Sequence, residues 1–157
     1  MKNEIKPASG KLGVLVVGLG GAVSSTFIVG TLAVRKGLST PIGSITQLAT
    51  IRLGKRNENN FPKIKDVVPL TNLNDLVFGG WDIFPEDVYE AACHAEVLNE
   101  KDLNGVKDEL KTIKPMPAAF DQNWVKRLHG THVKTSVNRW EMTEAIRKDI
   151  RDFKQAN

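Results

Sequence analysis

The amino-acid sequence predicts a single α/β domain in which helices flank a parallel sheet. Two observations carry this prediction: a short apolar run ends in a glycine cluster that opens a helical pattern, and later apolar runs alternate with amphipathic segments. The 157 residues suffice for one compact domain and not for two of ordinary size. Because 41% of them are hydrophobic and 25% are charged, the composition is that of a globular protein, which excludes wholesale disorder.

The first predicted strand spans residues 12–17, a run rich in β-branched side chains that is typical of a parallel strand buried on both faces. Gly18, Gly20 and Gly21 follow at once, and apolar residues at helical spacing begin at Phe27. Residues without a Cβ let a dinucleotide pyrophosphate approach the main chain, and the helix N-terminus offers it unpaired N–H groups. This order of elements predicts a dinucleotide site of the Rossmann type.

The glycine pattern is incomplete, so a second interpretation stays open. Val23 stands where the usual third glycine belongs, and no Asp or Glu occurs between Arg35 and Arg52, where a ribose-binding acid is expected about 20 residues after the loop. A glycine turn in an α/β protein that binds no nucleotide is the less favoured alternative. Arg35, Lys36 and Arg52 also leave open the 2′-phosphate of NADP as a ligand.

A later acid is the candidate for the ribose. The apolar run that ends in Gly79 and Gly80 predicts a strand with Asp82 at its carboxyl end, the edge at which open α/β sheets bind ligands. The alternative is that Asp82 caps the next helix, since residues 85–87 resemble a first helical turn.

Other features narrow the function classes. The uncharged stretch 12–34 is long enough to span a bilayer, but five glycines interrupt it, so a membrane anchor is the less favoured alternative. A net charge of +4 without clustering argues against a nucleic-acid partner. The single Cys93 indicates a cytoplasmic protein, and His129 and His132 lack a third ligand, so no metal site is predicted.

The remaining chain predicts further elements of an α/β fold. Asn138 and Glu141 form a capping pair at the start of the last predicted helix. Pro115 and Pro117 end the predicted helix over 102–113. The predicted elements are a strand over 48–53, an exposed loop over 55–65, and helices over 85–98, 102–113 and 139–153.

Four segments in order resemble the myo-inositol-1-phosphate synthase family, closest to its bacterial form. They are GLGGAVSST (18–26), GSITQLATIRLG (43–54), FGGWDI (78–83) and IRKDIRDF (146–153). The resemblance runs from about Lys11 to the last residue and covers only part of the family pattern. It implies a flexible N-terminus over residues 1–10 and an NAD-binding domain over 11–157 that ends before the later strands of its sheet.

The resemblance implies an NAD-dependent isomerase that converts D-glucose 6-phosphate to 1D-myo-inositol 3-phosphate and recycles its cofactor. The loop departs from the family's G-x-G-G-N-N-G at Ala22, Val23 and Ser24, while main-chain N–H groups survive any side chain. Carried over by position, the residues implied to bind NAD are Gly18, Gly20, Gly21, Ala22, Val23, Ser24, Asp82, Ser136 and Lys148.

The family's catalytic lysines and sugar-phosphate site belong to a region beyond residue 157, so no catalytic residue is assigned here. The isolated chain is therefore expected to show weak or absent turnover, with glucose 6-phosphate a ligand of full-length members only. The family also implies a homotetramer. A noncatalytic remnant or an interaction module that recruits another chain by an exposed sheet edge stays open as the alternative.

Overall fold

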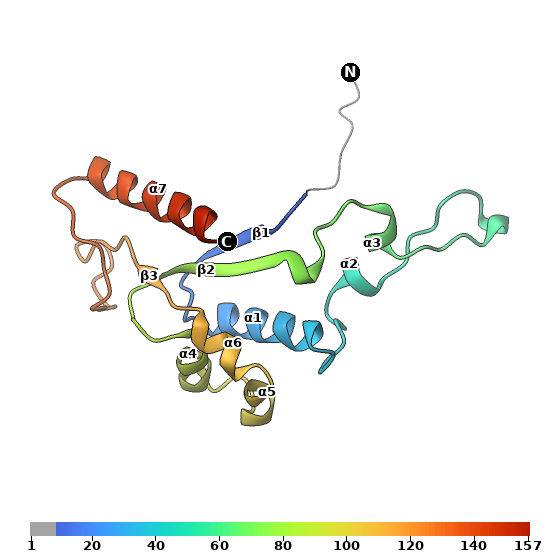
Figure 1. The fold of residues 1–157 in the computed structure, drawn as a ribbon, viewed down its shortest axis with the longest axis horizontal. Coiled ribbons are helices and arrows are strands. Elements are labelled where there is room, and N and C mark those ends of the chain that lie inside the picture. The colour runs from blue at the N-terminus through green and yellow to red at the C-terminus, as the bar shows by residue number, and fades with distance from the viewer. Residues whose placement is uncertain (1–8) are drawn as a thin grey trace, which may run out of the picture.

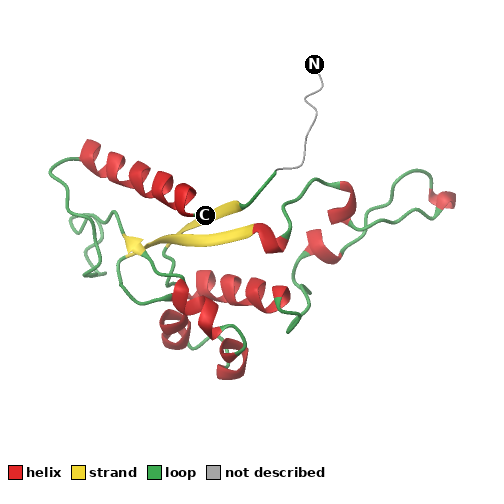
Figure 2. Cartoon of the chain, viewed as in Figure 1, coloured by secondary structure: helices red, strands yellow, loops and turns green. Residues whose placement is uncertain are grey.

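A three-stranded parallel sheet forms the centre of the protein, whose computed structural model describes residues 9–157. The strands are β1 (Leu12–Val17), β2 (Leu76–Asp82) and β3 (Met116–Pro117), in the order β1-β2-β3 (Figure 1 and Figure 2). Trp81 pairs with Val17 on one side and with Met116 on the other. The prediction of a parallel sheet flanked by helices is thereby confirmed. Residues 1–8 of the predicted flexible N-terminus lie outside the described part.

Helices cover the sheet on both faces (Figure 1). One face carries α1 (Ala22–Arg35), α4 (Val88–Ala95), α5 (Glu100–Asn104) and α6 (Lys107–Thr112), and the other carries α7 (Arg139–Ala156). The main core lies between β1, β2 and the four helices of the first face. Its buried residues are Leu19, Ile28, Val29, Leu32, Phe78, Val88, Ala92, Leu103, Val106 and Leu110.

The observed helix boundaries follow local hydrogen bonding. The capping pair is confirmed, because Asn138 accepts from the Glu141 N–H at 2.9 Å while Glu141 accepts from the Val137 N–H at 3.0 Å. The predicted helix over 85–98 is shorter, since Asp87 is extended and caps α4 instead of joining its first turn. The predicted helix over 102–113 is divided between α5 and α6, because the chain leaves helical geometry at Val106 to bury its side chain completely.

Residues 37–75 form an arm that projects from the sheet between α1 and β2 (Figure 1). It contains α2 (Ile45–Leu48), α3 (Ile64–Val67) and the 3-10 helices η1 (Arg56–Glu58) and η2 (Leu73–Asp75), and none of these four buries a residue. The strand predicted over 48–53 is wrong. The two legs of the arm form one isolated antiparallel bridge, Thr50 with Lys63, and a further hydrogen bond from the Leu53 N–H to the Asn60 carbonyl at 3.0 Å, which together make no continuous strand. The loop predicted over 55–65 is largely exposed.

The uncharged stretch 12–34 is divided into β1, a turn and α1, so it is not one continuous helix. Within the described residues, every helix is too short or too polar to cross a membrane.

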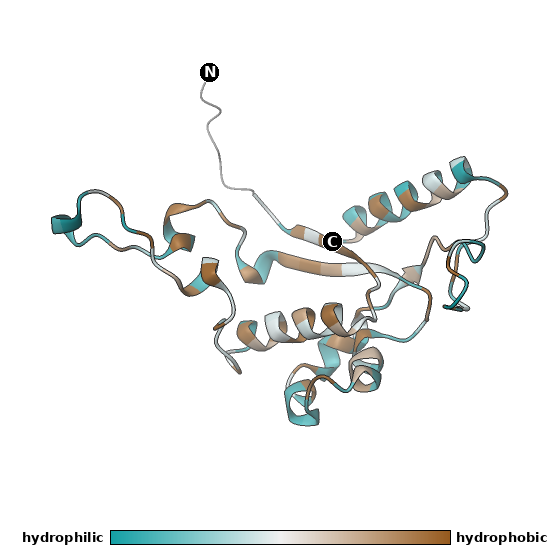
Figure 3. Ribbon diagram, turned by 180° about the vertical axis from the view of Figure 1, so that it is seen from behind, coloured by the Kyte–Doolittle hydropathy of each residue, from teal (hydrophilic) through white to brown (hydrophobic). Residues whose placement is uncertain are grey.

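Two strand glycines, Gly13 and Gly79, leave the space in which α7 packs on the sheet. Figure 3 shows hydrophobic bands alternating with hydrophilic ones along α7, as expected of a helix with one covered face. A Cβ at Gly13 would lie 2.9 Å from Cε1 of Phe153, and one at Gly79 would lie 2.5 Å from Cε2 of the same ring. The ring therefore occupies the space that two side chains would fill.

This packing predicts opposite effects of two glycine-to-alanine substitutions on the free energy of unfolding. Gly79→Ala is expected to lower the free energy of unfolding by about 1–3 kcal/mol, because the added methyl overlaps the Phe153 ring. Gly30→Ala, in the interior of α1 with nothing within 4 Å of a new Cβ, is expected to raise it by about 0.5–1 kcal/mol. Urea unfolding of both variants measures the difference. A Gly79→Ala protein as stable as the parent would contradict the packing described here.

Candidate dinucleotide-binding site

The glycine loop is held at the carboxyl end of β2. The N–H groups of Gly18 and Leu19 donate to the Trp81 carbonyl at 2.8 and 3.1 Å, and the Gly21 N–H donates back to the Gly18 carbonyl at 3.1 Å. Gly18 has φ +83°, a left-handed conformation that favours glycine. The loop is thus fixed against the sheet and turned on itself before α1 begins.

The first turn of α1 keeps its N–H groups free for a ligand. Gly21 is the N-cap residue and has no side chain to cap the helix. Among the described residues, nothing accepts a hydrogen bond from the N–H groups of Ala22, Val23 or Ser24. The first turn carries no acidic residue, so the positive end of the helix dipole is not neutralised there. Such a turn is suited to bind the oxygens of a phosphate.

Asp82 joins the loop to the end of β2. The residue is 8% exposed, and its carboxylate accepts from the Gly20 N–H at 2.7 Å and from the Phe84 N–H at 3.1 Å. The alternative that Asp82 caps the next helix is wrong, because Asp87 does so, accepting from the Glu90 N–H at 3.0 Å. Gly20 is closely surrounded: a Cβ there would lie 3.2 Å from Oδ2 of Asp82 and 3.3 Å from Cβ of Ala91.

Strand order explains why the expected acid is missing from its usual place in the sequence. In a dinucleotide-binding sheet, the acid ends the strand that follows the first helix and lies beside the first strand. Here that strand is β2, which pairs with β1 along its length. The projecting arm, residues 37–75, intervenes between α1 and β2 and moves the acid along the chain to position 82. In space, Asp82 therefore lies where the acidic residue that binds the ribose is expected.

A cleft of about 720 Å³ opens at this edge of the sheet. Gly18, Gly20, Gly21, Ala22 and Asp82 line it, so five of the residues predicted to bind the cofactor share one cavity. The other walls were not predicted from the sequence, and they belong to the ends of β1 and β2, to the segment between β2 and α4, to α4 itself and to the chain that follows β3. They are Val17, Trp81, Ile83, Phe84, Glu86, Ala91, His94, Ala95, Ala118, Ala119, Phe120 and Leu128. For Phe84 and Phe120 the available signal was their position just after a strand.

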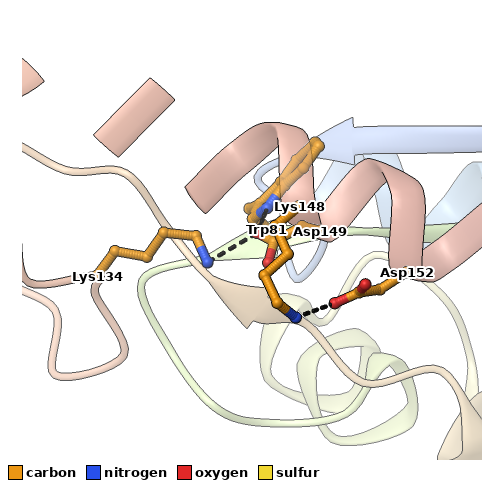
Figure 4. A network of polar contacts seen from close by, with 5 residues as sticks. All are labelled: Trp81, Lys134, Lys148, Asp149 and Asp152. Carbon is orange, nitrogen blue, oxygen red and sulfur yellow. Dashed lines mark hydrogen bonds and ion pairs between the residues drawn. The ribbon is translucent and has the colours of Figure 1, made fainter. Parts of the chain in front are cut away.

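The other predicted contacts lie outside the cleft. Val23 is 85% exposed, and the buried Ser24 hydroxyl donates to the Gly18 carbonyl at 2.8 Å. Ser136 is exposed and lines a separate hollow before α7. Lys148 is exposed on α7 and donates to Asp152 at 2.5 Å, a hydrogen bond that raises the pKa of Lys148 (Figure 4). A cofactor role for these four side chains stays a prediction.

The basic residues considered for an NADP phosphate lie elsewhere. Arg35 ends α1 and donates to the carbonyls of Leu73 and Leu76, and its burial lowers its pKa. Lys36 pairs with Glu109 at 2.5 Å. The 14 residues of α1 separate Arg35 from the glycine loop by about 20 Å. None of these side chains lines the cleft, and Arg52 lies on the projecting arm.

Comparison with known proteins assigns the family. A family model described as myo-inositol-1-phosphate synthase, an NAD-binding domain, matches residues 12–157. The chain belongs to the myo-inositol-1-phosphate synthase family. The resemblance inferred from four short segments is confirmed, and so is NAD as the cofactor of the family.

Relatives in the family agree in sequence and in fold. An inositol-3-phosphate synthase from Bacteroides thetaiotaomicron is 73% identical over 100% of this chain and 36% of its own length. One from Oryza sativa is 33% identical over 92% of this chain and 31% of its own. A solved structure of inositol-3-phosphate synthase from Caenorhabditis elegans superposes with a TM-score of 0.83 at 32% identity, over 96% of this chain and 32% of that one. This chain therefore spans about a third of the length of these relatives.

The hydrogen bonds of Asp82 predict a loss of stability when its carboxylate is removed. Asp82→Ala leaves the N–H groups of Gly20 and Phe84 without an acceptor, which is expected to cost about 1–3 kcal/mol in the free energy of unfolding. Asp82→Asn keeps one acceptor oxygen and is expected to cost less. Asp108→Ala, at an exposed position, should stay within about 0.5 kcal/mol of the parent. If Asp82→Ala unfolds at the same urea concentration as Asp108→Ala, the bonds do not hold the loop.

Proposed function

We propose that this chain supplies the NAD-binding part of an inositol-3-phosphate synthase, which converts D-glucose 6-phosphate to 1D-myo-inositol 3-phosphate. The proposal rests on one observation above the others. Asp82 fixes the Gly20 N–H at 2.7 Å, beside a helix start with free N–H groups and at the mouth of a cleft. The relatives called inositol-3-phosphate synthase support the reaction, while the sugar phosphate is proposed as a substrate of full-length members.

The loop fits the pyrophosphate of NAD. The loop has little room for side chains at Gly20 or Gly21, since a Cβ at Gly21 would lie 3.2 Å from the Gly18 carbonyl oxygen, and residues without a Cβ let a pyrophosphate approach the main chain. Phosphate oxygens would accept from the N–H groups of Ala22, Val23 and Ser24. The departures from the family's asparagines at Ala22 and Val23 leave these main-chain donors in place.

The rest of the cleft fits the other parts of the cofactor. Each carboxylate oxygen of Asp82 keeps a lone pair with which to accept from a ribose hydroxyl, and its negative charge disfavours a 2′-phosphate, so NAD is favoured over NADP. Phe84, Phe120 and Leu128 offer apolar surface to a base, and 720 Å³ is in the range of small-molecule sites.

The residues of this chain bind and orient, and none is assigned a catalytic role. Bound NAD would supply the hydride acceptor and donor that such an isomerase needs. Ser136 and Lys148 do not line the cleft, so they would contact the cofactor only if part of the bound cofactor extended beyond the cleft to reach them.

We also propose a homo-oligomer, as the family resemblance implies, and a cytoplasmic location, as the single cysteine indicates. The projecting arm supports an interface of this kind because its apolar side chains are exposed and its helices bury nothing. The exposed apolar residues of the arm are Leu38, Ile42, Ile45, Leu48, Ile51, Leu53, Phe61, Val67, Val68 and Leu70.

The proposed site predicts selective binding of NAD⁺ to the 157-residue chain. Isothermal titration calorimetry is expected to show binding of NAD⁺ and at least about tenfold weaker binding of NADP⁺, because Asp82 repels the added phosphate. Gly20→Val should weaken NAD⁺ binding by about tenfold or more, since its methyls reach Asp82 and Ala91.

Gly30→Ala is the matched control and should bind NAD⁺ as the parent does, because nothing lies within 4 Å of its new methyl. Thermal unfolding of each variant verifies that it is folded. A folded parent chain without any NAD⁺ response would refute the proposed function.

A further inference from the structure

A partly buried polar network joins α7 to the end of β2, on the face of the sheet away from α1 (Figure 4). Oδ2 of Asp149 accepts from the Trp81 indole N–H at 2.6 Å and pairs with the Lys134 ammonium at 2.7 Å. The Lys134 and Asp149 side chains are only 13% and 16% exposed. A hydrogen bond and an ion pair that share one carboxylate in such surroundings cost much more to break than a surface pair.

Trp81 connects this network to the glycine loop. Trp81 is 7% exposed and is one of the residues that line the cleft, and its carbonyl accepts from the N–H groups of Gly18 and Leu19. The next residue, Asp82, holds the Gly20 N–H. Trp81 is therefore bonded on both sides: its indole N–H donates to Asp149, and its main-chain carbonyl accepts from the first two N–H groups of the loop.

Lys134 extends the same network to the opposite wall of the cleft. The Lys134 N–H donates to the Ala118 carbonyl at 2.8 Å, and the Ala118 N–H donates to the His132 carbonyl at 3.0 Å. Ala118 lines the cleft just after β3. One carboxylate on α7 thus fixes two segments that meet at the cofactor site, although Asp149 itself does not line it.

We propose that Asp149 is a positioning residue for the cofactor, which acts through its bond to the Trp81 indole to fix the glycine-loop side of the cleft, while its ion pair with Lys134 stabilises the fold. The inference rests on the proposed binding of NAD. If Asp149 only packed the fold, the NAD⁺ affinity of each variant would fall together with its unfolding midpoint. If Asp149 positions the cleft, affinity would follow the indole bond alone. The two cases can be distinguished because the indole bond and the ion pair can be removed one at a time.

The test compares two substitutions of Asp149. Asp149→Leu removes both contacts and is expected to weaken NAD⁺ binding by about tenfold, the loss expected for one hydrogen bond to a charged group. Asp149→Asn keeps an oxygen for the indole and loses the charge that pairs with Lys134. It should therefore retain affinity within about twofold of the parent, while its unfolding midpoint falls toward that of the leucine variant.

Two further variants complete the design. Trp81→Phe removes the indole N–H and should weaken NAD⁺ binding as Asp149→Leu does, and the double variant should be no weaker than either single one, because both act through the same bond. Glu144→Gln, which breaks an exposed ion pair with Arg147 on the same helix, should change nothing. The Trp81 indole N–H resonance in ¹⁵N-labelled protein should shift in Asp149→Leu and stay in place in Glu144→Gln.

The outcomes separate this inference from the proposed function. Binding by the parent with unchanged affinity in Asp149→Leu, or affinities that follow the unfolding midpoints through all variants, would overturn the positioning role and leave NAD binding intact. A folded parent that binds no NAD⁺ would overturn both. If Asp149→Leu fails to fold, Trp81→Phe and Asp149→Asn still decide the matter.

Discussion

The attachment of the glycine loop to the end of β2 is the constraint on which the site depends. Three consecutive N–H groups, those of Gly18, Leu19 and Gly20, donate to two consecutive residues of β2, Trp81 and Asp82. Once they are engaged, the Gly21 N–H donates to the Gly18 carbonyl and the chain turns into α1, whose first N–H groups have no acceptor among the described residues. The proposed phosphate site would use main-chain N–H groups and no side chain of the loop, so it is compatible with Ala22 and Val23.

The two faces of the sheet contribute differently to this arrangement. On the α1 face, a continuous apolar core holds the helix whose N-terminus borders the cleft. On the α7 face, contact is partly polar: Phe153 lies against Gly13 and Gly79, and Asp149 accepts from the indole of Trp81. The small strand residues bring α7 near enough for that bond. The packing of α7 on the strand glycines thereby allows the bond between Asp149 and Trp81, a residue at the edge of the cleft.

The sequence was sufficient for those parts of the site that local chemistry determines. A buried strand, a turn needing φ +83° at Gly18 and a helix without a capping side chain follow one another without interruption, so their order could be predicted. The helix break at Val106 and the absence of a strand over 48–53 could not, because both depend on what neighbouring segments bury or pair with. The bond between Trp81 and Asp149 joins residues 68 positions apart, and only the fold reveals it.

The displaced acid shows how spatial order and sequence order separate in this fold. The search for an acid about 20 residues after the loop assumes that the helix returns directly to the neighbouring strand. Here an arm of 37–75 intervenes, yet the pairing of Leu12 with Leu76 through Val17 with Trp81 restores β2 to its place beside β1. Because loop-closure entropy grows only slowly with length, such an insertion leaves the pairing energetically accessible. The geometry of the cleft is therefore set by strand pairing, and Asp82 meets Gly20 whatever the length of chain between them.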